Sequence, residues 1–413
     1  MIFEIDKSQN QIQRTARDFV RGEFKKDVIN ELVEHGIYPE KIWKKAAELG
    51  FIGIHFPEKY SGQGLGAFEN VLVAEELCRG DSSVGACLAR AGHGAELLMR
   101  FGTDAQKEAW LPKVAEAEVL SCSALTEPGL GNDIARSQTS ATQEGDDWII
   151  NGTKTHVINA GPRAGFYVVL CRTDPGTSAT AQGLSTILVE SDREGIQVAD
   201  IGKKLGCRLM PISEVRLHQV RVPIDHLVGR ENRGLEQVLA CLNESRILSA
   251  AQSVGMAQGA FDRSFAYVKQ REQFGRKIID FQVTRQKVAD MATKIEAARL
   301  LTYQAAWSFD AKKGKSDDRL SAMAKLYAGR SAVEVCDEAI QLLGGYGYIQ
   351  EYEVERYFRD AKMAEIFDGT RTTPKTLHYR GLDAKRRAVI GRGEAQGSSF
   401  SVDNCRGPAL NKI

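Results

Sequence analysis

Residues Asp368, Gly369 and Thr370 are the part of this sequence whose types and spacing could most directly do chemistry. A carboxylate can remove a proton, and the glycine after it permits positive φ and lets a ligand approach the backbone. The threonine hydroxyl can donate a hydrogen bond to an anion. The triplet ends a segment, 341–370, that begins as a helical pattern, breaks at paired glycines and returns to a charged helix. Because Asp-Gly is also common in ordinary turns, the triplet alone does not identify a site.

The elements that must position this triplet fall into three parts. Residues 1–120 have apolar positions at helical spacing and are predicted to form an all-α domain. Within them the run VGACLARAGHGAELLMRFG, residues 84–102, is unusually small and apolar and is expected to be a helix packed closely on another element. Residues 121–230 contain short β-branched runs separated by Gly, Asp, Asn and Pro, which predicts an antiparallel β domain.

The C-terminal part, residues 231–385, contains four long helical patterns. Long alanine-rich helices of this kind predict an antiparallel four-helix bundle. Residues 386–413 lose this periodicity and are expected to be a flexible tail. The expected fold class is therefore α+β, with an all-α domain, a β domain and a helical bundle in that order.

The composition is that of an ordinary soluble globular protein and argues against several classes of function. The 55 Lys and Arg against 54 Asp and Glu give a net charge of +1, which does not favour a nucleic-acid or membrane-surface partner. No apolar run approaches the roughly 20 residues that a membrane helix needs, and the first residues do not resemble a targeting segment. The eight cysteines have no metal-ligand spacing, so we expect no metal site and a reducing, cytoplasmic environment.

Five motifs, the last of which contains the triplet, follow one another along the chain. They are LTEPGLGND at 125–133, KTHVINAG at 154–161, REQFGRKIIDFQ at 271–282, QLLGGYGY at 341–348 and IFDGT at 366–370. In this order they resemble the acyl-CoA dehydrogenase family, and the resemblance extends from about residue 5 to about residue 385. The resemblance implies helices, a β domain and a helical bundle, in agreement with the periodicity.

The resemblance implies that the protein holds FAD and that a carboxylate removes the α proton of an acyl-CoA thioester while the β hydrogen passes as hydride to flavin N5. Asp368 stands where most of the family has Glu, and its side chain reaches roughly 1.5 Å less. Some branches carry the base immediately before the arginine of the first bundle helix, but Ser245 at that position cannot serve. Asp368 is therefore the expected base, with Glu244 as the weaker alternative.

The resemblance also implies a set of FAD contacts. His156 and Ile158 stand where the family commonly has Trp and Thr, so a side-chain hydrogen bond to flavin N5 would be lost, and Asn132 replaces the usual Ser. The motif at 271–282 is expected to approach the FAD of a neighbouring subunit, which implies a homotetramer. The expected cofactor-binding residues are Thr126, Gly131, Asn132, His156, Ile158, Arg271, Gln273, Phe274, Gln341, Gly344, Gly345 and Thr370.

In the family the small run at 84–102 lines the acyl pocket, where Arg90 or His93 could add a polar group. The alternative is that its small residues only allow close helix packing, and the sequence leaves both open. The expected substrate-binding residues are Arg90, Ala91, Arg246, Phe367 and Gly369.

The function expected from this resemblance is that of an FAD-dependent acyl-CoA dehydrogenase that passes electrons to an electron-transfer flavoprotein. The shorter base and the small pocket run favour a compact, branched or alicyclic acyl group such as that of cyclohexane-1-carboxyl-CoA. One alternative is a nitroalkane-oxidase-like flavoenzyme, in which Lys375 would pair with a nitro anion. Another is an inactive acyl-CoA or flavin-binding homologue, which the changes at His156 and Ile158 would favour.

Overall fold

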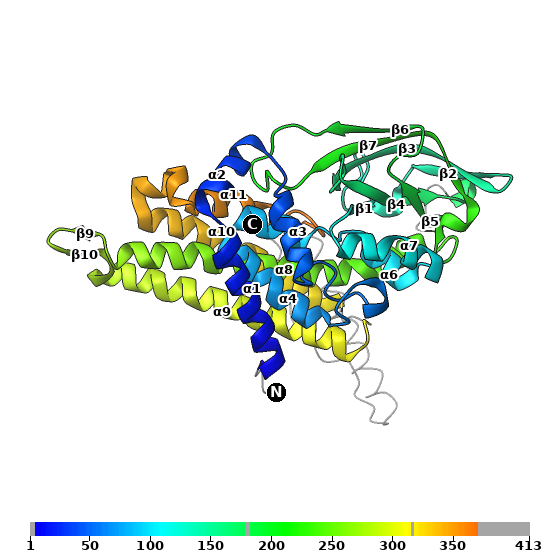
Figure 1. Ribbon diagram of the computed structural model, residues 1–413. Helices are drawn as coiled ribbons and strands as arrows, with labels where there is room; N and C mark the ends of the chain where they lie inside the picture. The colour runs from blue at the N-terminus through cyan, green and yellow to red at the C-terminus, as the bar shows by residue number, and fades with distance from the viewer. Residues whose placement is uncertain (1–4, 178–181, 315–317, 371–413) are drawn as a thin grey trace, which may run out of the picture.

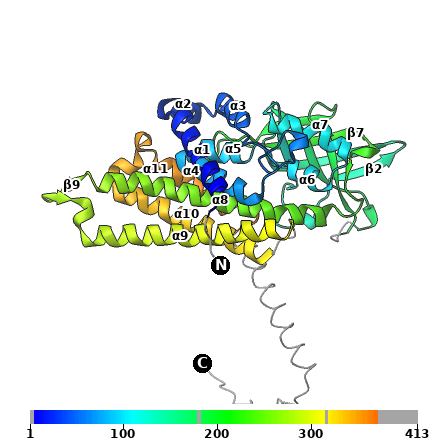
Figure 2. The same ribbon diagram turned by 60° about the horizontal axis from the view of Figure 1, so that its bottom comes forward.

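The computed structural model describes residues 5–177, 182–314 and 318–370. Along these ranges helices come first, an eight-stranded sheet follows, and long helices come last, which confirms the predicted α+β order (Figure 1). The sheet lies at one end of the molecule and the long helices extend away from it (Figure 1, Figure 2). The predicted tail, 386–413, and Lys375 lie outside the described residues. Among the described helices, none has an apolar stretch that could span a bilayer.

The N-terminal helices include a break that the sequence did not predict. The prediction of a single helix over 84–102 is wrong, because one helix ends and the next one begins within that run. Gly94 adopts φ 108, and a Cβ at this residue would lie 2.5 Å from the carbonyl carbon of Cys122. The chain therefore turns here and leaves Arg90 at a helix end. The helices are α1 (Lys7–Glu23), α2 (Lys26–His35), α3 (Glu40–Glu48), α4 (Ala67–Gly80), α5 (Ser82–Ala89), α6 (Ala95–Phe101) and α7 (Asp104–Ala115).

The sheet contains β1 (Leu120–Ala124), β2 (Ser140–Glu144), β3 (Asp147–Ile158), β4 (Ala164–Arg172), β5 (Leu184–Glu190), β6 (Ile196–Asp200), β7 (Ile212–Pro223) and β8 (Leu227–Val228). The strands lie in the order β6-β7-β3-β2-β4-β5-β8, with β1 paired to β4. Most neighbours are antiparallel, but β1 runs parallel to β4 along its whole length. The predicted antiparallel domain is therefore a mixed sheet, because the β2–β3 hairpin separates β1 from β4 and lets both run in one direction.

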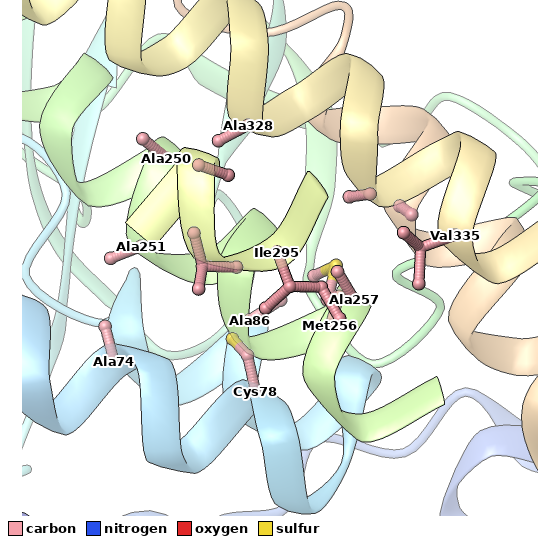
Figure 3. Packing of buried hydrophobic residues seen from close by; sticks show 14 of the residues in the cluster. Ala74, Cys78, Ala86, Ala250, Ala251, Met256, Ala257, Ile295, Ala328 and Val335 are labelled. Carbon is pink, nitrogen blue, oxygen red and sulfur yellow. The ribbon is translucent and has the colours of Figure 1, made fainter. Parts of the chain in front are cut away.

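The C-terminal helices are α8 (Gly234–Val268), α9 (Gln282–Ala311), α10 (Asp318–Leu343) and α11 (Val354–Ala364). α8 packs against α4, α9, α10 and α11. Figure 3 shows part of the apolar core between these helices, with Ala250 of α8 near Ala328 of α10, and Ile295 of α9 near Met256 of α8. Small side chains at such contacts let helix axes approach closely, which explains the alanine-rich pattern.

A short hairpin, β9 (Glu272–Gln273) and β10 (Arg276–Lys277), projects beyond the bundle at the end far from the sheet (Figure 1). Phe274 at its tip is 92% exposed. Tyr348, in the 3-10 segment that follows α10, is 86% exposed. This end of the bundle therefore presents large aromatic side chains to the outside.

Candidate active site

Asp368 lies just after α11, where the chain passes beside α8. Its backbone has φ 55, in the left-handed region that Asp tolerates better than most residues. Its side chain is only 5% exposed. The backbone conformation and the burial together fix the direction of the carboxylate.

A buried arginine holds one oxygen of this carboxylate. The side chain of Arg90 is 1% exposed, and its Nη2 lies 2.6 Å from Asp368 Oδ2. The hydroxyl of Ser249, on α8, donates to the same Oδ2. No donor among the described residues hydrogen-bonds to the second oxygen, Oδ1. Oδ1 is therefore the oxygen that remains to act on a ligand.

These contacts change the pKa of Asp368. Burial by itself would raise the pKa, but the Arg90 guanidinium and the Ser249 hydroxyl outweigh burial and hold the pKa well below its usual range. Burial, together with the same guanidinium, lowers the pKa of His93 to about 4. At neutral pH the site therefore holds an ionised Asp368 beside a neutral His93.

Three polar side chains of α8 position Arg90. Ser245 Oγ accepts from Nη1 at 2.6 Å, Ser249 Oγ accepts from Nη2 at 2.5 Å, and Gln252 Oε1 accepts from Nε at 3.2 Å. Their spacing of i, i+4 and i+7 places them on one face of the helix. The sequence prediction missed this set, although polar residues at helical spacing in an alanine-rich helix are a signal that could have found it.

Two further cations hold the main chain of the triplet. Arg246 Nε donates to the carbonyl of Asp368 at 3.0 Å, and Lys325 Nζ, on α10, donates to the carbonyl of Gly369. Burial lowers the pKa of Lys325 to about 8. The structure thus brings the predicted residues Arg246 and Gly369 to Asp368. Lys325 was not predicted, because no local pattern links it to Gly369.

The other two predicted substrate residues lie in different surroundings. The centroid of the Phe367 ring is 4.5 Å from the guanidinium carbon of Arg90, so this ring closes one side of the site. Ala91 is buried in the apolar core of the N-terminal helices, and its carbonyl accepts from the backbone N–H of Ser121. Ala91 is thus a packing residue here, and its contact with a substrate stays a prediction.

The first predicted FAD loop meets the end of the Asp368 triplet. The Asn132 amide donates to the Thr370 hydroxyl at 2.9 Å, although the two residues are far apart in sequence. At the neighbouring Gly131, chain neighbours aside, no described residue has an atom within 4 Å of the place where a Cβ would stand. Open glycine backbone of this kind suits the close approach of a cofactor.

The second predicted FAD motif lies at the end of β3, beside the first. The Thr155 N–H donates to the Thr126 carbonyl at 2.9 Å. His156 is exposed with φ 53, whereas Ile158 is buried in the apolar cluster that contains α8 and α10. Ile158 therefore supplies apolar surface but no hydrogen-bond donor.

A buried ion pair anchors this part of the sheet and was not predicted from the sequence. Lys154 is fully buried, and its Nζ lies 2.8 Å from Glu127 Oε1. The same Nζ donates to the Leu125 carbonyl and to the Ser137 hydroxyl. Burial alone would raise the pKa of Glu127, but the positive charge of Lys154 has the larger effect and lowers this pKa to about 2. The pair ties the loop that carries Thr126 to β3.

The second group of predicted FAD residues lies at the far end of the bundle. One cleft of about 690 Å³ is lined by Arg271, Gln273, Gln341, Gly344 and Gly345. Gly344 has φ 61. At both Gly344 and Gly345, chain neighbours aside, no atom of the described part of the chain lies within 4 Å of the place where a Cβ would stand. Open glycine backbone beside an arginine suits a ligand that contains a pyrophosphate. Phe274 lies at the hairpin tip and does not line this cleft.

The two groups are separated along α8. Asp368 contacts Ser249 near the middle of this helix, and Arg271 follows its C-terminal end. The helix from Ser249 to Val268 is about 29 Å long at 1.5 Å per residue. The described chain therefore does not bring both groups around one small molecule.

Glu244, the weaker alternative base, faces a separate cavity of about 890 Å³ that is also lined by His55, Arg100 and Asp310. Arg100 Nη1 lies 3.9 Å from Glu244 Oε2, which is too far for a hydrogen bond. Burial is therefore only weakly offset and raises the pKa of Glu244 to about 7. Glu244 is partly protonated at neutral pH, unlike Asp368.

Three domain families of known proteins match successive parts of this chain. The acyl-CoA dehydrogenase N-terminal domain matches residues 6–118, the middle domain matches 122–220 and the C-terminal domain matches 232–381. The chain belongs to the acyl-CoA dehydrogenase family. It is an acyl-CoA dehydrogenase, an oxidoreductase of a family that uses FAD.

Relatives cover nearly the whole of this dehydrogenase. The caffeyl-CoA reductase–Etf complex subunit CarC of Acetobacterium woodii is 37% identical over 361 residues, which are 87% of this chain and 94% of CarC. The short-chain-specific acyl-CoA dehydrogenase of Clostridium acetobutylicum is 36% identical over 378 residues, 91% of this chain and 98% of that protein. The structure of butyryl-CoA dehydrogenase from Megasphaera elsdenii has a TM-score of 0.87 at 34% identity and covers 92% of this chain and 100% of that one. The three parts of the chain thus form the acyl-CoA dehydrogenase fold.

Proposed function

We propose that Asp368 removes the α proton of an acyl-CoA thioester whose acyl group is compact and branched or alicyclic, such as cyclohexane-1-carboxyl. One observation carries this proposal: Asp368 is buried and ionised, Arg90 and Ser249 hold its Oδ2, and Oδ1 remains to accept a proton. A carboxylate held at one oxygen presents the other in a fixed direction, which a general base needs.

The residues around the triplet keep this base in place. Arg246 and Lys325 hold the carbonyls of Asp368 and Gly369, so the main chain stays fixed while the side chain gains a proton. A fixed main chain matters more for Asp than for Glu, because the shorter side chain has fewer rotatable bonds with which to adjust. Glu244 is not the base in this proposal, because it faces the neighbouring cavity.

Two features support a compact acyl group. The side chains of Arg90 and Phe367 stack beside Asp368 and fill space there. The large neighbouring cavity is lined in part by apolar side chains, among them Phe68, Met99 and Trp307, but it also carries Glu244, His55 and Arg100. A long hydrocarbon chain in it would take these three polar groups out of water without offering them partners. Straight-chain fatty acyl groups therefore fit this surrounding poorly.

FAD would supply the hydride acceptor, and residues of this chain fit it in two places. The open loop at Gly131, with Asn132 and Thr370, would hold the flavin end, and the cleft at Arg271 and Gly344 would hold the adenosine end. Because about 29 Å of α8, from Ser249 to Val268, lies between the parts of the molecule that carry these two places, a second subunit would complete each site within a homotetramer. The exposed aromatic side chains at the end of the bundle support such a contact.

The proposed electron acceptor is an electron-transfer flavoprotein. The relative from Acetobacterium woodii is by name a subunit of an Etf complex. We expect the reduced enzyme to be reoxidised faster by an electron-transfer flavoprotein than by oxygen. Faster reoxidation by oxygen would instead favour nitroalkane-oxidase-like chemistry.

The test is anaerobic reduction of the bound flavin by butyryl-CoA, octanoyl-CoA and cyclohexane-1-carboxyl-CoA, followed as loss of visible absorbance. We expect the alicyclic thioester to reduce the flavin faster than either straight-chain thioester. Faster reduction by a straight-chain thioester would overturn the proposed acyl group. No reduction by any thioester, in protein that holds flavin, would overturn the proposed role of the site.

A further inference from the structure

The ion pair between Arg90 and Asp368 creates an imbalance of charge during the proposed reaction. Among the described residues, Asp368 is the one carboxylate that pairs with Arg90. When Asp368 accepts the α proton it becomes neutral, and a guanidinium that is 1% exposed loses its counter-charge. A buried cation without an anionic partner is costly.

The surrounding protein groups do not replace the lost charge. Ser245, Ser249 and Gln252 accept hydrogen bonds from Arg90, but all three are neutral. His93 offers no negative charge, and burial lowers its pKa to about 4. These contacts are already present before the proton moves, so a further acceptor for the guanidinium would have to come from the bound substrate, where an oxygen atom, charged or neutral, would partly offset the cost.

We propose that Arg90 selects acyl groups that carry an oxygen acceptor, namely a hydroxyl, carbonyl or carboxylate oxygen, near Cβ or Cγ. This inference rests on the proposed function, because it takes Asp368 as the base. Arg90 Nη2 reaches Asp368 Oδ2 at 2.6 Å, so an acceptor on carbons close to Cα lies within reach of the same nitrogen.

The contacts of Arg90 allow this exchange of partners. Nη1 and Nε stay bound to Ser245 and Gln252, while Nη2 moves its hydrogen bond from Asp368 to the substrate oxygen. A guanidinium suits this role because it presents five N–H donors in one rigid plane. Once released, Asp368 is a stronger base, since the guanidinium that lowered its pKa now faces the substrate.

The acceptor contact predicts a measurable preference between acyl groups of equal size. A hydrogen bond to a charged group changes binding by about tenfold to a hundredfold. We therefore expect such a preference for 4-hydroxybutyryl-CoA over valeryl-CoA, which differ by a hydroxyl in place of a methyl. The ring pair 3-hydroxycyclohexane-1-carboxyl-CoA and 3-methylcyclohexane-1-carboxyl-CoA makes the same comparison for alicyclic groups.

The first experiment measures kcat/KM of the wild-type holoenzyme for both pairs. A hydroxyl preference of about tenfold or more supports the role of Arg90. Equal values, or a preference for the methyl compounds, overturn this inference and leave the proposed function standing. If no thioester of either pair reduces the flavin, the proposed function fails, and the binding experiment below still tests Arg90.

The second experiment measures binding without turnover. Calorimetry gives the Kd of the enoyl products of the linear pair, 4-hydroxybut-2-enoyl-CoA and pent-2-enoyl-CoA. The variants are Asp368→Asn, which keeps the cation, and the double variant Arg90→Met with Asp368→Asn, which removes both charges and so leaves no buried ion unpaired. We expect the hydroxyl preference to persist in Asp368→Asn and to disappear in the double variant. A preference that survives the loss of Arg90 overturns the inference.

Discussion

Two buried carboxylates of this dehydrogenase lie near arginines and have opposite ionisation behaviour. Asp368 has Arg90 Nη2 at 2.6 Å and a serine hydroxyl on the same oxygen, and its pKa lies well below the usual range. Glu244 has Arg100 Nη1 at 3.9 Å without a hydrogen bond, and burial raises its pKa to about 7. Burial pushes both pKa values upward, so the distance and geometry of the cation decide the outcome.

The difference in arginine contact explains how Asp368 stays ionised although it is buried. A direct charge-assisted hydrogen bond offsets the cost of burying the Asp368 carboxylate. A cation about 4 Å away, with no shared proton, does not do so for Glu244. A pKa near neutrality therefore does not by itself mark the base in this protein.

The largest expected effect is on the rate of flavin reduction, which should depend on Asp368 and not on Glu244. Asp368→Asn should slow flavin reduction by about 10³-fold to 10⁴-fold, because it removes the general base and keeps a similar shape. Glu244→Gln should change the rate less than about threefold, since Glu244 faces another cavity. Anaerobic stopped-flow absorbance measures both. A greater loss in Glu244→Gln than in Asp368→Asn would reverse the assignment.

The next effect compares the two arginines. Arg90→Met should lower the free energy of unfolding by about 3–5 kcal/mol, because it leaves the buried Asp368 without its cation. Arg100→Met should cost about 1–2 kcal/mol, since Arg100 mainly donates to the carbonyls of Ala240 and Gly314. Denaturant titration at pH 7 compares the variants. Equal losses would show that the shorter ion pair contributes no more than the longer one.

A third comparison concerns the pH dependence of stability. The pKa of Glu244 is about 7 in the folded protein against an ordinary value of 4.5, so between these values the folded state binds more protons than the unfolded state. Stability from this group therefore falls as pH rises from about 4.5 to about 7 and is level above that range. Over the whole range the loss should be about 3.5 kcal/mol, at about 1.4 kcal/mol for each of about 2.5 pKa units.

Glu244→Gln tests this expectation, because the amide does not titrate. Between pH 5 and pH 8 the wild-type protein should lose about 2.5 kcal/mol more unfolding free energy than the variant. Asp368 does not interfere with this comparison, since its lowered pKa affects stability only below its ordinary value of 3.8. Identical pH profiles would mean that Glu244 is ionised throughout.

The sequence predicted the order of the three parts and named several residues that lie together at the site. The long alanine-rich patterns correspond to α8, α9 and α10. Small side chains at helical spacing let these long helices pack closely against one another in the apolar core. The resemblance also named Asn132 and Thr370 among the expected FAD-binding residues, and these two residues hydrogen-bond to each other in the structure. The order of motifs along the chain can therefore indicate which distant residues share a site, whereas local periodicity cannot.

The parts that escaped prediction depend on contacts between residues distant in sequence. Arg90 and Asp368 are 278 positions apart, and nothing local to either one announces an ion pair. The break between α5 and α6 arises because the backbone at Gly94 packs against Cys122, again a tertiary contact. The parallel pairing of β1 with β4 likewise follows from sheet assembly and leaves no period in the sequence.

The measurement that tests the central claim most directly is exchange of the α proton with solvent. Phenylacetyl-CoA has α protons but no β hydrogen that can leave as hydride, so only the proton transfer can occur. In D₂O, mass spectrometry should find deuterium at Cα with the wild-type holoenzyme and with Glu244→Gln, and only background exchange with Asp368→Asn. Exchange at the wild-type rate in Asp368→Asn would contradict the claim that the carboxylate held by Arg90 is the base.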